Sequence, residues 1–79
     1  MRVRLRFFAA LREQMGASAE RTVRAGTTVG ALWRSLVAER PELGAVPVRF
    51  VVNETYVGAS HRLADGDEVA FFPPVSGGT

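Results

Sequence analysis

The residues best placed for chemistry are two glycines near the C-terminus, Gly77 and Gly78, in the segment FFPPVSGGT. Glycine has no side chain, so a Gly-Gly segment can enter a channel that any Cβ would block. Pro73 and Pro74 precede the glycines and favour extended backbone. A carboxylate at such a tip is a poor acyl donor, but activation by ATP as an acyl-adenylate makes it a good one. The segment predicts a slender reactive tail, against the alternative of an ordinary frayed terminus.

The other candidate side chains lack the companions that catalysis or metal binding needs. The absence of cysteine excludes disulfides, thiolate nucleophiles and cysteine-ligated metals. His61 is the one histidine, so we expect neither a catalytic dyad nor a zinc site. Asp65, Asp67 and Glu68 lack the further ligands of a calcium loop, and Asp-Gly-Asp is typical of a turn. We therefore expect no metal and no bound cofactor.

The basic side chains are ten arginines without a lysine, and the formal net charge is only +2. The isoelectric point of about 10.4 is high because arginine keeps its proton and few other groups titrate above neutrality. It gives little support to nucleic-acid binding, and we expect none. Without lysine, the chain cannot accept an isopeptide bond on its own side chains.

Three of the arginines, Arg2, Arg4 and Arg6, alternate with apolar residues and so share one face of an expected first strand. Arg49 is expected near them. These arginines form either a solvated sheet face or contacts to carboxylates on a partner.

The hydrophobic pattern predicts one domain with a single main helix. Strands are expected at 1–9, 19–25, 46–53 and 68–72, a short extended piece within 53–58, a helical turn at 10–16, and a helix from Thr28 to about Glu39. This order predicts an α+β fold of the β-grasp, or ubiquitin-like, class, with a mixed sheet of four to five strands. Residues 1–72 would form the domain and residues 73–79 a free, extended tail. No apolar run is long enough to span a membrane and the N-terminus does not resemble an export signal, so we expect a cytoplasmic protein with no membrane partner.

The segments FFAALRE, VVNETYV and LADGDEVAFFPPVSGG resemble the small subunits of molybdopterin synthase, which belong to a group of sulfur carriers that includes those of thiamine synthesis. The resemblance implies that a ubiquitin-activating-type enzyme adenylates the carboxylate of Gly78 with ATP. A sulfur donor protein then supplies the sulfur of a thiocarboxylate. The tail enters the large synthase subunit and delivers sulfur to precursor Z, within a heterotetramer of two small and two large subunits. The chain itself would be a cosubstrate with no catalytic site of its own.

The resemblance also implies the site residues. Gly78 carries the acyl group, Gly77 precedes it, and the tail residues Pro73, Pro74 and Val75 contact the partner. Phe8, Tyr56 and Phe72 form an apolar docking patch. The alternation of the first strand independently puts Phe8 on the face opposite Val3, Leu5 and Phe7, and we expect Phe71 in the core.

Thr79 does not fit the family pattern, which ends at the second glycine. We expect Thr79 to be removed before activation; the alternatives are a residue added during cloning and an activating enzyme that tolerates it. Other functions remain open: a carrier for tRNA thiolation or thiamine, a ubiquitin-like protein modifier, or a small binding module with a disordered tail.

Overall fold

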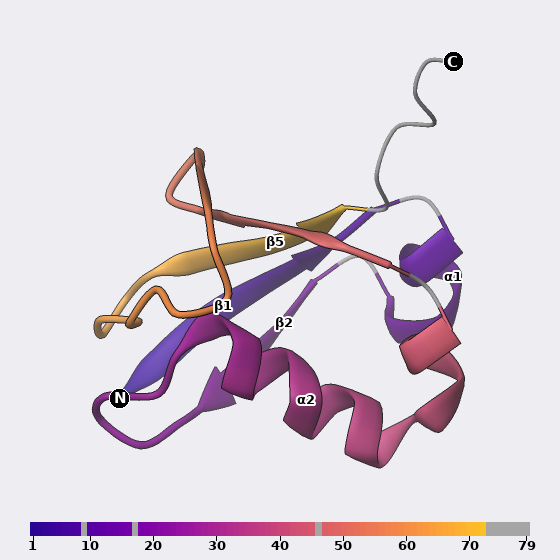
Figure 1. The fold of residues 1–79 in the computed structure, drawn as a ribbon, viewed down its shortest axis with the longest axis horizontal. Coiled ribbons are helices and arrows are strands. Elements are labelled where there is room, and N and C mark those ends of the chain that lie inside the picture. Colours follow the sequence, from indigo (N-terminus) through magenta and orange to yellow (C-terminus); the bar gives the residue numbers. More distant parts are fainter. Residues whose placement is uncertain (9, 17, 46, 73–79) are drawn as a thin grey trace.

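The computed structural model describes residues 1–8, 10–16, 18–45 and 47–72. They form a single five-stranded mixed sheet with one long helix on one of its faces (Figure 1). The elements in chain order are β1 (Arg2–Phe7), α1 (Ala10–Met15), β2 (Ser18–Thr22), α2 (Val29–Glu39), the 3-10 helix η1 (Pro41–Ala45), β3 (Arg49–Val52), β4 (Thr55–Val57) and β5 (Glu68–Phe72). This is the predicted β-grasp fold. The expected tail, residues 73–79, lies outside the described residues.

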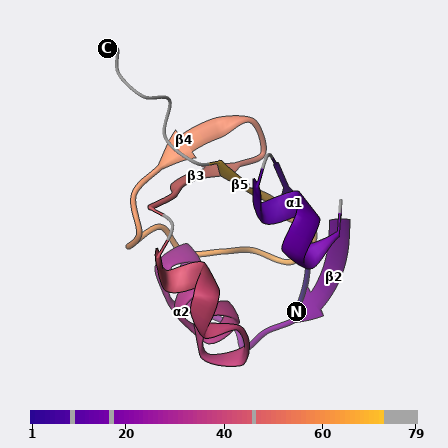
Figure 2. The same cartoon turned by 90° about the vertical axis from the view of Figure 1, so that its right-hand side faces the viewer.

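The strands lie in the order β2-β1-β5-β3-β4, so the first and last strands of the chain are neighbours at the centre of the sheet. β1 and β5 run parallel, with Phe7 beside Phe71, and the other neighbouring pairs run antiparallel. Parallel neighbours need a crossover connection. The long connection from β1 to β5 contains α2, which covers one face of the sheet. On the other side, called the open face below, no described helix covers the strands (Figures 1 and 2).

The core lies between the sheet and α2. Alternation along β1 buries Val3, Leu5 and Phe7 and leaves the arginines between them exposed. The side chain of Thr28 caps α2 by accepting a hydrogen bond from the backbone nitrogen of Ala31 at 3.1 Å. From there Val29, Leu32 and Leu36 are buried at helical spacing, and Trp33 packs against Phe71 with ring centroids 5.0 Å apart.

One local expectation was wrong, and one element was not predicted. The second strand ends at Thr22 rather than Ala25, because residues 24–27 form a turn in which the Thr27 nitrogen bonds to the Arg24 carbonyl at 3.1 Å. The chain after α2 forms η1, which the hydrophobic pattern did not predict. Its Leu43 is fully buried, so one apolar side chain holds an otherwise exposed turn against the core.

The carboxylates near Gly66 have structural roles. Asp67 accepts hydrogen bonds from the Ala64 nitrogen at 2.7 Å and the Asn53 side-chain amide at 2.8 Å, and Asp65 accepts one from the Arg2 nitrogen at 2.7 Å. Their interpretation as turn residues is therefore confirmed. No helix in the described part of the chain is long and apolar enough to cross a membrane.

Candidate functional site

The parallel pairing of β1 with β5 brings two of the predicted patch residues together. Because Phe7 lies beside Phe71, the next residues, Phe8 and Phe72, are also neighbours, and alternation turns them to the open face. Their rings stack with centroids 4.3 Å apart and planes 10° from parallel. Phe71 is fully buried on the other side, as expected. β5 ends at Phe72, so the stacked pair stands where the chain leaves the sheet.

A hollow of about 190 Å³ opens beside this stacked pair. Its lining residues are Arg6, Phe8, Val51, Glu54, Glu68, Ala70 and Phe72. Ala70 lies on the central strand β5 and has the smallest side chain of the set. The prediction did not include Val51, Ala70 or Glu54. Ala70 could have been found from the sequence, because it lies two residues before Phe72 and therefore on the same face of β5. Val51 could not, because it lies on β3 and joins the hollow only through its pairing with Ala70.

Two of the lining residues, Arg6 and Glu68, form an ion pair on one side of the hollow. Arg6 lies 3.3 Å from the Glu68 carboxylate, and its guanidinium carbon lies 5.7 Å from the centre of the Phe8 ring. Both charged side chains are partly exposed, so the pair adds little stability. Its main effect is to hold Arg6 against the aromatic pair, with an added cation–π contact.

Tyr56, the third predicted patch residue, lies farther away. It is on the edge strand β4, opposite Val51 of β3, and 68% of its surface is exposed. The register puts it on the same face as the two phenylalanines. No stacking contact joins it to either ring within the described residues. The patch therefore consists of a compact Phe8–Phe72 pair and a separate exposed tyrosine.

The remaining predicted site residues fall in the tail. Gly77, Gly78, Pro73, Pro74 and Val75 lie outside the described residues, so their roles stay predictions.

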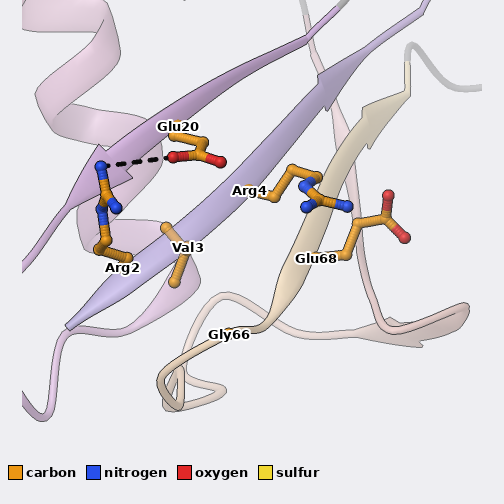
Figure 3. Close-up of a pocket in the computed structure, with 6 residues that line it drawn as sticks. All are labelled: Arg2, Val3, Arg4, Glu20, Gly66 and Glu68. Atoms are coloured by element: carbon orange, nitrogen blue, oxygen red, sulfur yellow. Dashed lines mark ion pairs between the residues drawn. The ribbon is translucent and has the colours of Figure 1, made fainter.

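The predicted arginine face is present, with a difference. Arg2, Arg4 and Arg6 lie on the open face along β1, and Figure 3 shows the hollow that Arg2 and Arg4 share with Glu20 and Glu68. Arg2 forms an ion pair with Glu20 of β2 at 3.5 Å. Arg49 is on the same face but not beside them: its neighbour on β5 is Phe72, and β5 separates β3 from β1.

The shortest ion pair among the described residues lies away from this face. Arg21 of β2 donates two hydrogen bonds of 2.6 Å to the Glu39 carboxylate at the end of α2. These hydrogen bonds lower the pKa of Glu39 and raise that of Arg21. The pair joins an edge strand to the helix and has a structural role. Among the described side chains, no three metal-ligating groups come together.

Comparison with known proteins agrees with this geometry. The profile of the ThiS family matches residues 5–78, a range that includes Gly77 and Gly78. A relative from Escherichia coli named molybdopterin synthase sulfur carrier subunit is 39% identical, over 96% of this chain and 99% of its own.

Two solved structures extend the comparison. The small archaeal modifier SAMP1 of Haloferax volcanii superposes with a TM-score of 0.81 and is 30% identical, covering 99% of this chain and 100% of its own. A chain from the complex of subunits 1 and 2 of the molybdopterin-converting factor of Helicobacter pylori has a TM-score of 0.69 and 26% identity, covering 99% of this chain and 100% of its own. With a ubiquitin-like fold, an aromatic pair at the exit of the last strand and a family match over most of its length, the chain belongs to the ThiS family.

Proposed function

We propose that this protein is a sulfur carrier of molybdenum cofactor biosynthesis, the small subunit of a molybdopterin synthase. The observation that carries the proposal is the full-length similarity to a protein named as that subunit, together with a family match that runs to Gly78. The fold supports it, because Phe8 and Phe72 stack at the end of β5, the last described element before Gly77 and Gly78 in the sequence.

The proposed chemistry takes place at the carbonyl carbon of Gly78. Hydrolysis of the Gly78–Thr79 peptide bond first frees the Gly78 carboxylate. A ubiquitin-activating-type enzyme joins one carboxylate oxygen to the α-phosphate of ATP and releases pyrophosphate. Sulfur that a donor protein delivers at the oxidation level of sulfide then attacks the same carbon and displaces AMP, which leaves a thiocarboxylate. ATP acts as a substrate of the activating enzyme, so the chain itself needs no cofactor, and we expect the reaction in the cytoplasm.

The proposed partner for sulfur delivery is the large subunit of molybdopterin synthase, in a heterotetramer. The Helicobacter pylori structure is of a complex between two subunits of this kind of factor, which supports the assignment. The stacked Phe8–Phe72 pair would dock on that partner while the tail enters its active site. A half-buried aromatic pair beside a hollow is typical of an anchor point in a protein interface.

Intact mass spectrometry of the protein from its native host tests the carrier function. We expect a species that ends at Gly78, with one oxygen replaced by sulfur in part of the population. A population that always keeps Thr79 and never contains the extra sulfur would overturn the proposal.

Docking is tested by Phe72→Arg, which places a charge in the aromatic pair. We expect it to abolish complex formation with the large subunit. Ala38→Arg is a matched control, because Ala38 is exposed on α2, on the other side of the molecule, and should still bind. Equal binding by both variants would show that the aromatic pair does not dock.

A protein modifier is the second candidate, favoured by the similarity to the archaeal modifier SAMP1. Such a modifier would join Gly78 to lysine side chains of other proteins. The chain has no lysine, so chains linked through its own side chains cannot form. Recovery of Gly78 in isopeptide bonds to other proteins would favour this candidate, and recovery of the thiocarboxylate bound to the large subunit would favour the carrier.

A further inference from the structure

The charges of the open face divide into paired and unpaired groups. Arg2 pairs with Glu20 at 3.5 Å, and Arg6 pairs with Glu68 at 3.3 Å. Arg4 and Arg49 are exposed and form no ion pair with any carboxylate in the described part of the chain. In Figure 3, Arg4 extends across β5 toward Glu68, but that carboxylate is engaged by Arg6. Of the two guanidiniums near Glu68, only that of Arg6 pairs with the carboxylate, which leaves the positive charge of Arg4 uncompensated.

The strand register fixes how Arg4 and Arg49 lie relative to the hollow. On β5, which separates their two strands, Glu68 is the neighbour of Arg4 and Phe72 is the neighbour of Arg49. Ala70 lies midway between Glu68 and Phe72. From the rise along a strand and the spacing between strands, the Cα atoms of Arg4 and Arg49 are about 16 Å apart, with Ala70 near the midpoint. The two unpaired arginines therefore flank the hollow on opposite sides.

We propose that Arg4 and Arg49 bind two carboxylates of the docked partner, one on each side of an apolar partner side chain that sits over Ala70. This rests on the proposed function, since it describes the surface of the partner to which the Phe8–Phe72 pair docks. The hollow supplies the seat for the apolar side chain, with Val51 and the two phenylalanines in its lining. Guanidinium groups suit carboxylates because they donate two parallel hydrogen bonds.

One carboxylate at the rim restricts the orientation of the partner. Glu54 lines the hollow, is exposed, and forms no ion pair within the described residues. Its backbone is left-handed, with φ of 71°, because Glu54 lies in the tight turn between β3 and β4. A partner carboxylate near Glu54 would be repelled. The two carboxylates of the partner must therefore lie near Arg4 and near Arg49, and away from the part of the hollow that Glu54 lines.

The test measures binding of the large synthase subunit from the same organism to single variants at several salt concentrations. Arg4→Gln and Arg49→Gln should each weaken binding about fivefold and reduce its salt dependence. The sites are far apart, so the double variant should lose about 25-fold. Arg2→Gln is the matched control, because its guanidinium is already paired with Glu20, and it should bind like the parent. Glu54→Gln should bind at least as tightly as the parent.

The outcomes separate the two proposals. If the parent chain binds the large subunit but Arg4→Gln and Arg49→Gln bind as tightly as Arg2→Gln, the inference fails and the carrier function stands. If the parent chain does not bind at all, both fail. Self-association of the chain that disappears in the Arg4→Gln variant, measured by sedimentation, would also overturn the inference, because the carboxylates would then come from a second copy. Thermal unfolding of each variant checks that the fold is intact.

Discussion

Among the glycines in the described part of the chain, Gly30 is the one at which an added methyl group meets the closest contacts. It lies in the first turn of α2, and its nitrogen donates to the Ala59 carbonyl at 2.9 Å. A Cβ on residue 30 would lie 2.8 Å from the Ala59 Cβ and 2.9 Å from the Ala59 oxygen. Both contacts are too short, and neither belongs to a flexible side chain. Either α2 or the connection after β4 must move in a Gly30→Ala variant.

The magnitude follows from two opposing effects. Alanine is a better helix former than glycine by at most about 1 kcal/mol, and less in a first turn. Overpacking at a rigid contact costs roughly 1–3 kcal/mol. Movement of the connection also strains two hydrogen bonds, from Gly30 to Ala59 and from Val29 to His61, each with a net value of about 1 kcal/mol. We expect a net destabilisation of about 2 kcal/mol, which for a domain of this size lowers Tm by roughly 8–16 °C.

Thermal and urea unfolding measure this change, with Gly58→Ala as the matched control. Gly58 lies in the same connection, but a Cβ there meets nothing within 4 Å and the glycine does not have positive φ. Gly58→Ala should be neutral or slightly stabilising. If Gly30→Ala unfolds at the same temperature as the parent chain or higher, the close approach of α2 to Ala59 is wrong.

Three further predictions concern separate parts of the molecule. Leu43→Ala, which empties the buried anchor of η1, should cost about 2–5 kcal/mol in urea unfolding, whereas a change near zero would mean that η1 does not pack on the core. Glu54→Gly relieves a left-handed backbone, so it should raise the free energy of unfolding by about 1 kcal/mol, and a loss of stability would contradict the φ of 71°. Arg21 lowers the pKa of Glu39 from its ordinary 4.5, so the pair stabilises the fold above that pH and loses its effect as pH falls through the lowered pKa. The Tm difference between the parent and Glu39→Gln should therefore shrink from about pH 6 to about pH 3, and a constant difference would refute the pairing.

Much of the architecture could be read from local patterns. The period-two alternation of residues 2–7 is enough to predict that Val3 is buried and Arg4 exposed. The helical spacing from Val29 to Leu36 is enough to predict which side of α2 is buried. These patterns are properties of neighbouring residues. The ends of the elements were less predictable. The turn that follows β2 is closed by a hydrogen bond to the Arg24 carbonyl, and η1 packs on the core only through the buried side chain of Leu43.

Some features of the candidate site could likewise be predicted from the sequence, and others were set by the tertiary structure. The prediction of a reactive tail rests on residue types in the sequence by itself. The placement of Phe8 and Phe72 on the sheet face away from the core also follows from the sequence, because alternation is a local property. Which of the arginines is paired, and which strand lies beside which, were decided by the tertiary structure. Phe8 and Phe72 are 64 positions apart in the sequence and stack only because β1 and β5 pair in parallel. Arg4 and Arg49 flank one hollow for the same physical reason: register between distant strands, which no local pattern encodes, sets the distance between side chains.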